Sequence, residues 1–240
     1  MVAFDFTGKV VLITGATGAL GGVVARKFHQ AGATLALSAR DATTLNQLFA
    51  DLALDPQHLL VGGLDLREPE DCDRLARAVE DQFGRLDALV NTVGGFTAGP
   101  PVHETPLNDW DQMLAMNLRT AFLISRAIVP LLIRSGGGAI VHVSGRAGLM
   151  GFAGGAGYCA AKAGVLRLTE TLSEELKAHG INVNCVLPGT IDTPSNRAAR
   201  PDADFARWVA PDALGEVIMF LCSPAARALH GAAIPVYGLS

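Results

Sequence analysis

The chain has 240 residues, of which 50% are hydrophobic and 18% are charged, and its formal net charge is −4. This composition suits a single α/β domain with a large apolar core. The chain has no basic block, which argues against nucleic acid as a partner.

The cysteines and the apolar runs indicate in which cellular compartment the protein works. The four cysteines show neither metal-ligand spacing nor a disulfide framework, so we expect no metal and a reducing environment. The N-terminal residues carry Asp5 and Lys9 and lack a signal-peptide core. The longest apolar run, residues 121–133, is short for a membrane span and holds Arg126. We therefore expect a cytoplasmic protein that does not bind membranes.

Strands and helices alternate along the chain. Short apolar runs bounded by turn residues predict strands, and 3.6-residue periodicity predicts helices. The expected strands are 10–13, 34–39, 58–64, 86–90, 139–143, 181–187 and 233–236. The expected helices run from the first turn to 31, then 42–52, 69–83, 108–133 (with a kink at Pro130), 156–178 and 212–221. This order predicts one domain, residues 1–240, with a doubly wound parallel sheet of about seven strands and helices on both faces.

A glycine-rich turn follows the first strand, with the spacing Gly15-x-x-Gly18-x-x-Gly21. Glycines let the backbone approach a pyrophosphate, and the helix N-terminus offers free N–H groups. A tight strand–helix connection would need similar glycines, but the position after the first strand favours a dinucleotide. The expected contacts at the turn also include Thr17, Ala19 and Leu20.

The end of the second strand bears on cofactor choice. An acid there would bind ribose hydroxyls, whereas an arginine accommodates a 2′-phosphate. Here Arg40 follows Ser38-Ala39, so we expect NADP to be preferred over NAD. The neighbouring Asp41 weakens this expectation unless it caps the next helix. The alternative is that Arg40 is a solvated surface residue.

Tyr158 and Lys162 are four residues apart in a predicted helix and therefore share a face. A phenol has a pKa of about 10, and an ammonium about 4 Å away lowers it by up to ~3 units. Such a pair is suited to general acid–base chemistry, although most Tyr/Lys pairs at this spacing are ordinary surface residues.

Five short motifs occur in order: the glycine turn, Asn91-x-x-Gly94, Asn117, Tyr158-x-x-x-Lys162 and Pro188-Gly189. With them the chain resembles the short-chain dehydrogenase/reductase family over its whole length. The resemblance implies that Tyr158 is the general acid in carbonyl reduction. It implies that Lys162 lowers the pKa of Tyr158 and holds the nicotinamide ribose.

The resemblance also implies the remaining site residues and the assembly. Asn117 would anchor a water that links Lys162 to solvent. The further cofactor contacts would be Asp65, Leu66, Asn91, Gly94, Pro188, Gly189, Ile191 and Thr193. A loop at about 190–211 would cover the substrate, and its Arg197, Arg200 and Arg207 suit a polar or anionic one. Family members usually pair through long helices, so we expect a homo-oligomer, a dimer or tetramer.

The sequence departs from the family pattern at two places. The turn has Ala19 where the common pattern has glycine, with Gly18 one position earlier. The catalytic serine position falls on Gly145, and Ser144 stands beside it. Adjacent strand residues point to opposite faces, so Ser144 substitutes only if a bulge re-aims it. Otherwise Tyr158 polarises the carbonyl alone, or the substrate needs little polarisation.

These observations predict an NADPH-dependent carbonyl reductase similar to 3-oxoacyl-carrier-protein reductases, acting on a small carbonyl or alcohol. The first alternative is a reductase of pterin-type or quinone-type rings, which would need no catalytic serine. The second is an NADP-binding regulatory protein without turnover.

Overall fold

The computed structural model describes residues 4–239; residues 1–3 and 240, which the expected domain includes, lie outside the described part. Seven strands form one parallel sheet in the order β3-β2-β1-β4-β5-β6-β7. The strands are β1 (Val10–Thr14), β2 (Thr34–Ala39), β3 (Leu59–Gly62), β4 (Ala88–Asn91), β5 (Gly138–Val143), β6 (Ile181–Pro188) and β7 (Ala233–Val236). The expected fold class is confirmed.

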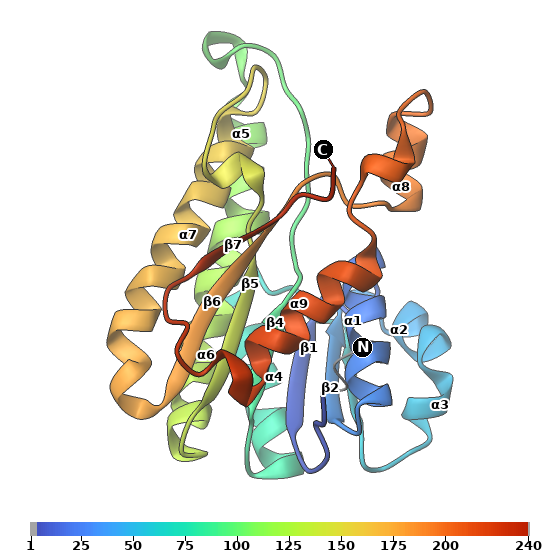
Figure 1. Ribbon diagram of the computed structural model, residues 1–240, viewed down its shortest axis with the longest axis vertical. Coiled ribbons are helices and arrows are strands. Elements are labelled where there is room, and N and C mark those ends of the chain that lie inside the picture. The colour runs from blue at the N-terminus through green and yellow to red at the C-terminus, as the bar shows by residue number, and fades with distance from the viewer. Residues whose placement is uncertain (1–3, 240) are drawn as a thin grey trace.

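Helices cover both faces of the sheet (Figure 1). The helices are α1 (Ala19–Gln30), α2 (Ala42–Leu48), α3 (Ala50–Ala53), α4 (Pro69–Phe83), α5 (Leu107–Leu114), α6 (Thr120–Arg134), α7 (Ala156–Leu176), α8 (Pro194–Ala199) and α9 (Pro211–Cys222). A π-helical segment, Ala115–Arg119, joins α5 to α6.

Strand β1 is apolar throughout because both of its faces are buried. Val11 and Ile13 pack in the core on the α1 and α9 side, whereas Val10 and Leu12 pack on the α4 and α6 side. A strand buried on both faces has no solvent side to alternate with. Order along the sheet reverses between β1 and β4, and open α/β sheets bind ligands beyond the strand ends at such a point.

Two helical predictions were wrong in detail. The helix expected over 42–52 is broken at Phe49, whose φ of −125° and ψ of 39° are not helical and whose side chain is buried. The segment after β6, expected to be a long loop, contains α8. Thr193 is the N-cap of this helix, and its side chain accepts a hydrogen bond from the Asn196 amide. The Thr193-Pro194 pair is a helix-start signal that the weak periodicity of the segment obscured.

Strand ends also differ from expectation. β3 begins at Leu59 because His58 uses its Nδ1, 3.0 Å from the Leu35 amide nitrogen, to accept the hydrogen bond there. The expected 86–90 strand is Ala88–Asn91. α6 continues through Pro130 to Arg134.

Within the described residues, Leu107–Arg134 forms a continuous helix that is long and apolar enough to cross a membrane. Half of its most apolar window is buried inside the fold, and the helix packs on α4 and α7. Core helices of globular domains commonly meet the same criterion, so the helix is weak evidence for a membrane span.

Candidate active site

The turn after β1 is built for a close approach. Gly15 has a φ of 72°, and its carbonyl accepts a 2.9 Å hydrogen bond from the Gly18 amide. A Cβ on Gly21 would lie 2.2 Å from the Gly15 oxygen, so only glycine fits there. The α1 N-terminus has no side-chain cap, which leaves its first N–H groups for an anion. This cradle fits the pyrophosphate of a dinucleotide.

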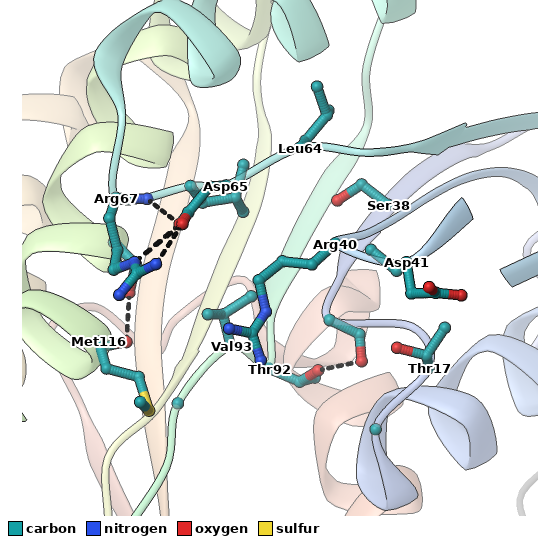
Figure 2. A pocket seen from close by; sticks show the side chains of 16 residues that line it. Thr17, Ser38, Arg40, Asp41, Leu64, Asp65, Arg67, Thr92, Val93 and Met116 are labelled. Atoms are coloured by element: carbon teal, nitrogen blue, oxygen red, sulfur yellow. Dashed lines mark hydrogen bonds and ion pairs between the residues drawn. The ribbon is translucent and has the colours of Figure 1, made fainter. Parts of the chain in front are cut away.

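A cleft of about 260 Å³ lies beyond the ends of β1, β2, β3 and β4 (Figure 2). Its walls include the predicted cofactor residues Gly15, Thr17, Gly18, Arg40, Asp65, Leu66 and Gly94. Ala19 and Leu20 form the first turn of α1 beside it, with the Leu20 side chain in the core. The volume and the mixed polar lining fit the adenosine half of a dinucleotide.

Arg40 and Asp41 separate at the mouth of this cleft. Arg40 extends its side chain into the cleft (Figure 2). The Asp41 carboxylate instead accepts a 2.5 Å hydrogen bond from the Thr44 amide and caps α2, which lowers the pKa of Asp41. The carboxylate thus caps the helix, the condition under which we expected a phosphate to be compatible with Arg40, and it remains part of the cleft wall.

Asp65 carries an ion pair that the sequence interpretation missed. The Arg67 guanidinium binds the Asp65 carboxylate through several short contacts, and its hydrogen bonding lowers the pKa of Asp65. Arg67 also lines the cleft. The D-x-R spacing was visible in the sequence, but such short-range pairs are common on surfaces.

Asn91 lies under the cleft instead of in its wall. Its side chain is buried, and its Oδ1 accepts a 2.6 Å bond from the Thr14 hydroxyl, so it ties β4 to β1. The next residues, Thr92, Val93 and Gly94, form the wall. The Asn91 side chain therefore supports the cleft, and the expected cofactor contact of this residue stays a prediction.

Asn117 sits in the π-helical segment between α5 and α6 and is buried. Its Oδ1 accepts from the Gly95 amide at 3.1 Å, and its Nδ2 donates to the carbonyls of Gly95 and Met113 at 3.0 Å each. A Cβ on Gly94 would lie 2.8 Å from Asn117 Oδ1 and 3.2 Å from Lys162 Nζ. Asn117 thus holds the loop after β4 against the Lys162 ammonium.

Tyr158 and Lys162 share one face of α7, as expected, and burial shifts the pKa of both. Lys162 Nζ donates to the Val143 carbonyl at 3.0 Å and lies 5.6 Å from the centre of the Tyr158 ring. Burial raises the pKa of Tyr158 to about 12 and lowers the pKa of Lys162 to about 8. Burial therefore sets the direction of the Tyr158 pKa in the cofactor-free protein, and the expectation that Lys162 lowers this pKa stays a prediction.

The structure answers where Ser144 points. Its hydroxyl donates to the Lys162 backbone carbonyl at 2.8 Å and is buried against α7. A Cβ on Gly145 would instead lie 3.6 Å from the Tyr158 hydroxyl, with no closer contact. No bulge re-aims Ser144, so its assignment as a catalytic residue is wrong, and the space beside the Tyr158 hydroxyl is left by Gly145.

The segment after β6 holds the remaining predicted cofactor residues. The Gly189 amide donates to Val236, which pairs with Pro188 at the end of the sheet. Ile191 forms a parallel bridge with Val209. Thr193 caps α8, and Asp192 pairs with Arg197 at 2.5 Å and 2.7 Å. The Pro188 carbonyl and the Tyr158 hydroxyl both border the position of a Cβ on Gly145, whereas none of the residues of this segment lines the adenosine cleft.

Neither His142 nor a metal site adds a catalytic group among residues 4–239. His142 is buried, with its Nε2 3.2 Å from the Ser125 hydroxyl, and burial lowers its pKa to about 4, so it is a core residue. Residues 4–239 contain no group of three or more His, Cys, Asp or Glu side chains able to hold a metal.

Comparison with known proteins gives the class of this chain. Residues 9–204 match the short chain dehydrogenase family. The chain is 32% identical to the D-threitol dehydrogenase of Mycolicibacterium smegmatis, over 99% of this chain and 95% of that protein. It is 31% identical to the 3-oxoacyl-[acyl-carrier-protein] reductase of Thermotoga maritima, over 96% and 97%.

A solved structure agrees with these relatives. Carveol dehydrogenase from Mycobacterium avium, in complex with NAD, superposes with a TM-score of 0.86 at 28% identity and covers 98% of both chains. The chain belongs to the short chain dehydrogenase family. It is therefore an oxidoreductase that uses a nicotinamide cofactor, and not a regulatory protein without turnover.

Proposed function

We propose that this enzyme reduces a carbonyl to an alcohol with NADPH, in the manner of the 3-oxoacyl-carrier-protein reductases it resembles. The observation that carries the proposal is the position of Tyr158. The Tyr158 hydroxyl lies next to the space that Gly145 leaves. Lys162 lies in the same helix, α7, and its ammonium reaches Gly94 in the loop after β4. A reacting carbonyl there is within reach of a proton donor.

The Tyr158 phenol acts as the general acid. With its pKa raised to about 12, it is protonated at neutral pH and able to donate a hydrogen bond to the carbonyl oxygen. When bound, the reduced nicotinamide supplies the hydride. The carbonyl carbon gains that hydride, its oxygen gains the Tyr158 proton, and the product is the alcohol.

Lys162 and Asn117 would hold the nicotinamide ribose and return a proton to Tyr158 after each reduction. The Lys162 ammonium sits beside Gly94, where it would bind ribose hydroxyls. The Asn117 amide oxygen already accepts one bond, and a second lone pair can accept from a water. Such a water would connect Lys162 to solvent. Pro188, Gly189, Ile191 and Thr193 would contact the nicotinamide from the segment after β6.

Arg40 supports NADP over NAD. It extends into the adenosine cleft while the Asp41 carboxylate, which also lines the cleft, caps α2, so a 2′-phosphate would meet the Arg40 guanidinium there. We also propose that the enzyme is cytoplasmic and homo-oligomeric, and that residues 1–240 act as one domain with a substrate loop at about 190–211.

A second candidate activity is favoured by Gly145. Without a hydroxyl donor beside Tyr158, the carbonyl receives one hydrogen bond fewer, and loss of one oxyanion donor costs about 10²–10³ in rate in other enzymes. A ring of the quinone or pterin type needs less polarisation than a simple ketone. The same Tyr158 proton would serve that reduction.

The Tyr158→Phe variant tests both activities. We expect it to lower kcat for NADPH oxidation across a panel of ketones, diketones and quinones by at least about 10²-fold, since general acid catalysis typically contributes 10²–10⁴. Cofactor binding, followed by NADPH fluorescence, should change little. Equal turnover by wild type and variant on every carbonyl would contradict the proposal.

A further inference from the structure

Four large apolar side chains stand exposed on the loops that follow β4 and β5, and two of them form an aromatic cluster with Tyr158. They are Phe96, Leu149, Met150 and Phe152, here called the apolar rim, with exposures of 51%, 58%, 54% and 47%. The two loops are joined where the Gly99 amide donates to the Gly154 carbonyl at 2.8 Å. Exposed apolar side chains beside a proposed proton donor mark a candidate ligand surface.

The aromatic members of the rim are connected to the proposed proton donor. The Phe96 ring meets the Tyr158 ring edge-on, with centroids 4.9 Å apart, and the Phe152 ring follows at 6.0 Å from Phe96. A Cβ on Gly155 would lie 2.6 Å from the Phe152 ring. The Phe152 ring therefore occupies space that a side chain at Gly155, just before α7, would fill.

Arginines of the segments that follow β5 and β6 are engaged within the protein. Arg197 pairs with Asp192 and lies 4.7 Å above the Phe205 ring. Arg207 donates to the Leu239 carbonyl at 2.8 Å, and Arg146 lies 5.3 Å above the Tyr237 ring. The expectation that arginines of the substrate loop suit a polar or anionic substrate is therefore not supported at Arg197 and Arg207.

We propose that the substrate carries an aryl or similarly flat apolar group beside an activated carbonyl. The ring would rest on the apolar rim against Phe96 and Phe152, and the carbonyl oxygen would enter the space at Gly145 and accept the Tyr158 proton. Gly145 offers room for a flat group next to the carbonyl but no donor, which favours a carbonyl already activated by a second one. This inference rests on the proposed function and names its substrate class.

A matched pair of diketones tests the substrate class. 1-Phenyl-1,2-propanedione and 2,3-butanedione share an activated dicarbonyl and differ by phenyl against methyl. With NADPH and the wild-type enzyme we expect kcat/KM to favour the phenyl compound by about tenfold or more, because a ring buries much more apolar area than a methyl group. Equal values, or a preference for butanedione, would overturn the inference.

Matched variants test whether the preference for the phenyl compound depends on the apolar rim. Phe152→Ser should reduce the phenyl preference about tenfold, whereas Leu48→Ser, at an equally exposed apolar site of α2, should leave it unchanged. A preference that survives Phe152→Ser, or that falls equally in Leu48→Ser, counts against the rim.

Binding without turnover separates this inference from the proposed function. In Tyr158→Phe, saturation-transfer NMR should show the phenyl protons of 1-phenyl-1,2-propanedione bound, and the signal should disappear when Phe152→Ser is added. If neither diketone is reduced by wild type yet this pattern holds, the proposed function fails and the aryl site stands. If reduction occurs and the phenyl signal is absent or indifferent to Phe152→Ser, the aryl site fails alone.

Discussion

Lys162 is a cation that the fold buries without a carboxylate partner among residues 4–239. Its Nζ bonds the Val143 carbonyl, and burial lowers its pKa to about 8. A group held in this way destabilises the cofactor-free protein, since the unfolded chain would solvate the ammonium. The proposed function would explain why the cost is tolerated, because the same ammonium faces Gly94, where a ribose would bind.

The buried ammonium predicts a pH dependence of stability. Between pH 8 and pH 10.5, the folded pKa and the ordinary value, the unfolded chain binds more protons at Lys162, so stability rises with pH. Relative to Lys162→Met, the free energy of unfolding of wild type should rise by about 1–2 kcal/mol from pH 7.5 to pH 9.5. Urea unfolding of both proteins measures this, and a pH-independent difference would contradict it.

Arg40 carries the prediction on cofactor choice. Arg40→Ala should raise the Kd for NADPH by about 10–100-fold, since a hydrogen bond to a charged group contributes ~1.5–3 kcal/mol. NADH lacks the 2′-phosphate and serves as the matched control, so its Kd should hardly move. Fluorescence titration with both cofactors measures the effect. Equal losses for the two would mean that Arg40 acts on something other than the phosphate.

At the scale of elements, the β1–α1 turn shows how one strand–helix junction serves two purposes. Gly21 lets the first turn of α1 approach the Gly15 carbonyl, which packs the helix on β1. The same approach leaves the α1 N-terminus bare for a pyrophosphate. Packing and binding therefore depend on one missing side chain, whereas the adjacent Gly22 has ordinary space around it.

Two neighbouring alanine substitutions separate these roles. Gly21→Ala forces a Cβ to 2.2 Å from the Gly15 oxygen, so we expect a loss of about 1–3 kcal/mol in unfolding free energy and weakened NADPH binding. Gly22→Ala meets nothing closer than 3.5 Å, and alanine favours a helix by ~1 kcal/mol over glycine, so stability should rise or hold. Urea unfolding and NADPH fluorescence measure both. A Gly21→Ala protein with normal stability would refute the packing argument.

For the whole molecule, the continuous helix through α5 and α6 shows apolar side chains to solvent. Leu107, Phe122 and Ile133 are 79%, 49% and 37% exposed on it. Exposed apolar groups on long helices fit the expected homo-oligomer, in which α7 would take part.

A charge on this helix tests the assembly. Phe122→Glu should weaken self-association at least about tenfold, because an unpaired carboxylate would be desolvated in the interface. Leu48→Glu, at the same 49% exposure on α2, should keep the wild-type mass. Sedimentation of the three proteins measures it. A wild-type monomer, or an oligomer indifferent to Phe122→Glu, would remove this helix from the interface.

Local residue patterns account for the parts of the fold that the sequence predicted. The apolar runs of β1 and β2, the Asp41 cap and the glycine turn each act through neighbours in the chain. Phe49 escaped prediction because its inward turn depends on a core formed by distant strands. The cluster of Phe96 with Tyr158 and Phe152 escaped because both ring contacts of Phe96 join segments separated by more than fifty residues.

The sequence by itself determined the alternation of strands and helices, the cofactor turn and the pairing of Tyr158 with Lys162, because each follows from spacing along the chain. Only the tertiary structure decided that Ser144 bonds the α7 backbone, that Gly145 leaves the space beside the Tyr158 hydroxyl, and that the Tyr158 pKa rises. The physical reason is that side-chain direction and burial depend on what the fold packs around a residue, which spacing does not contain.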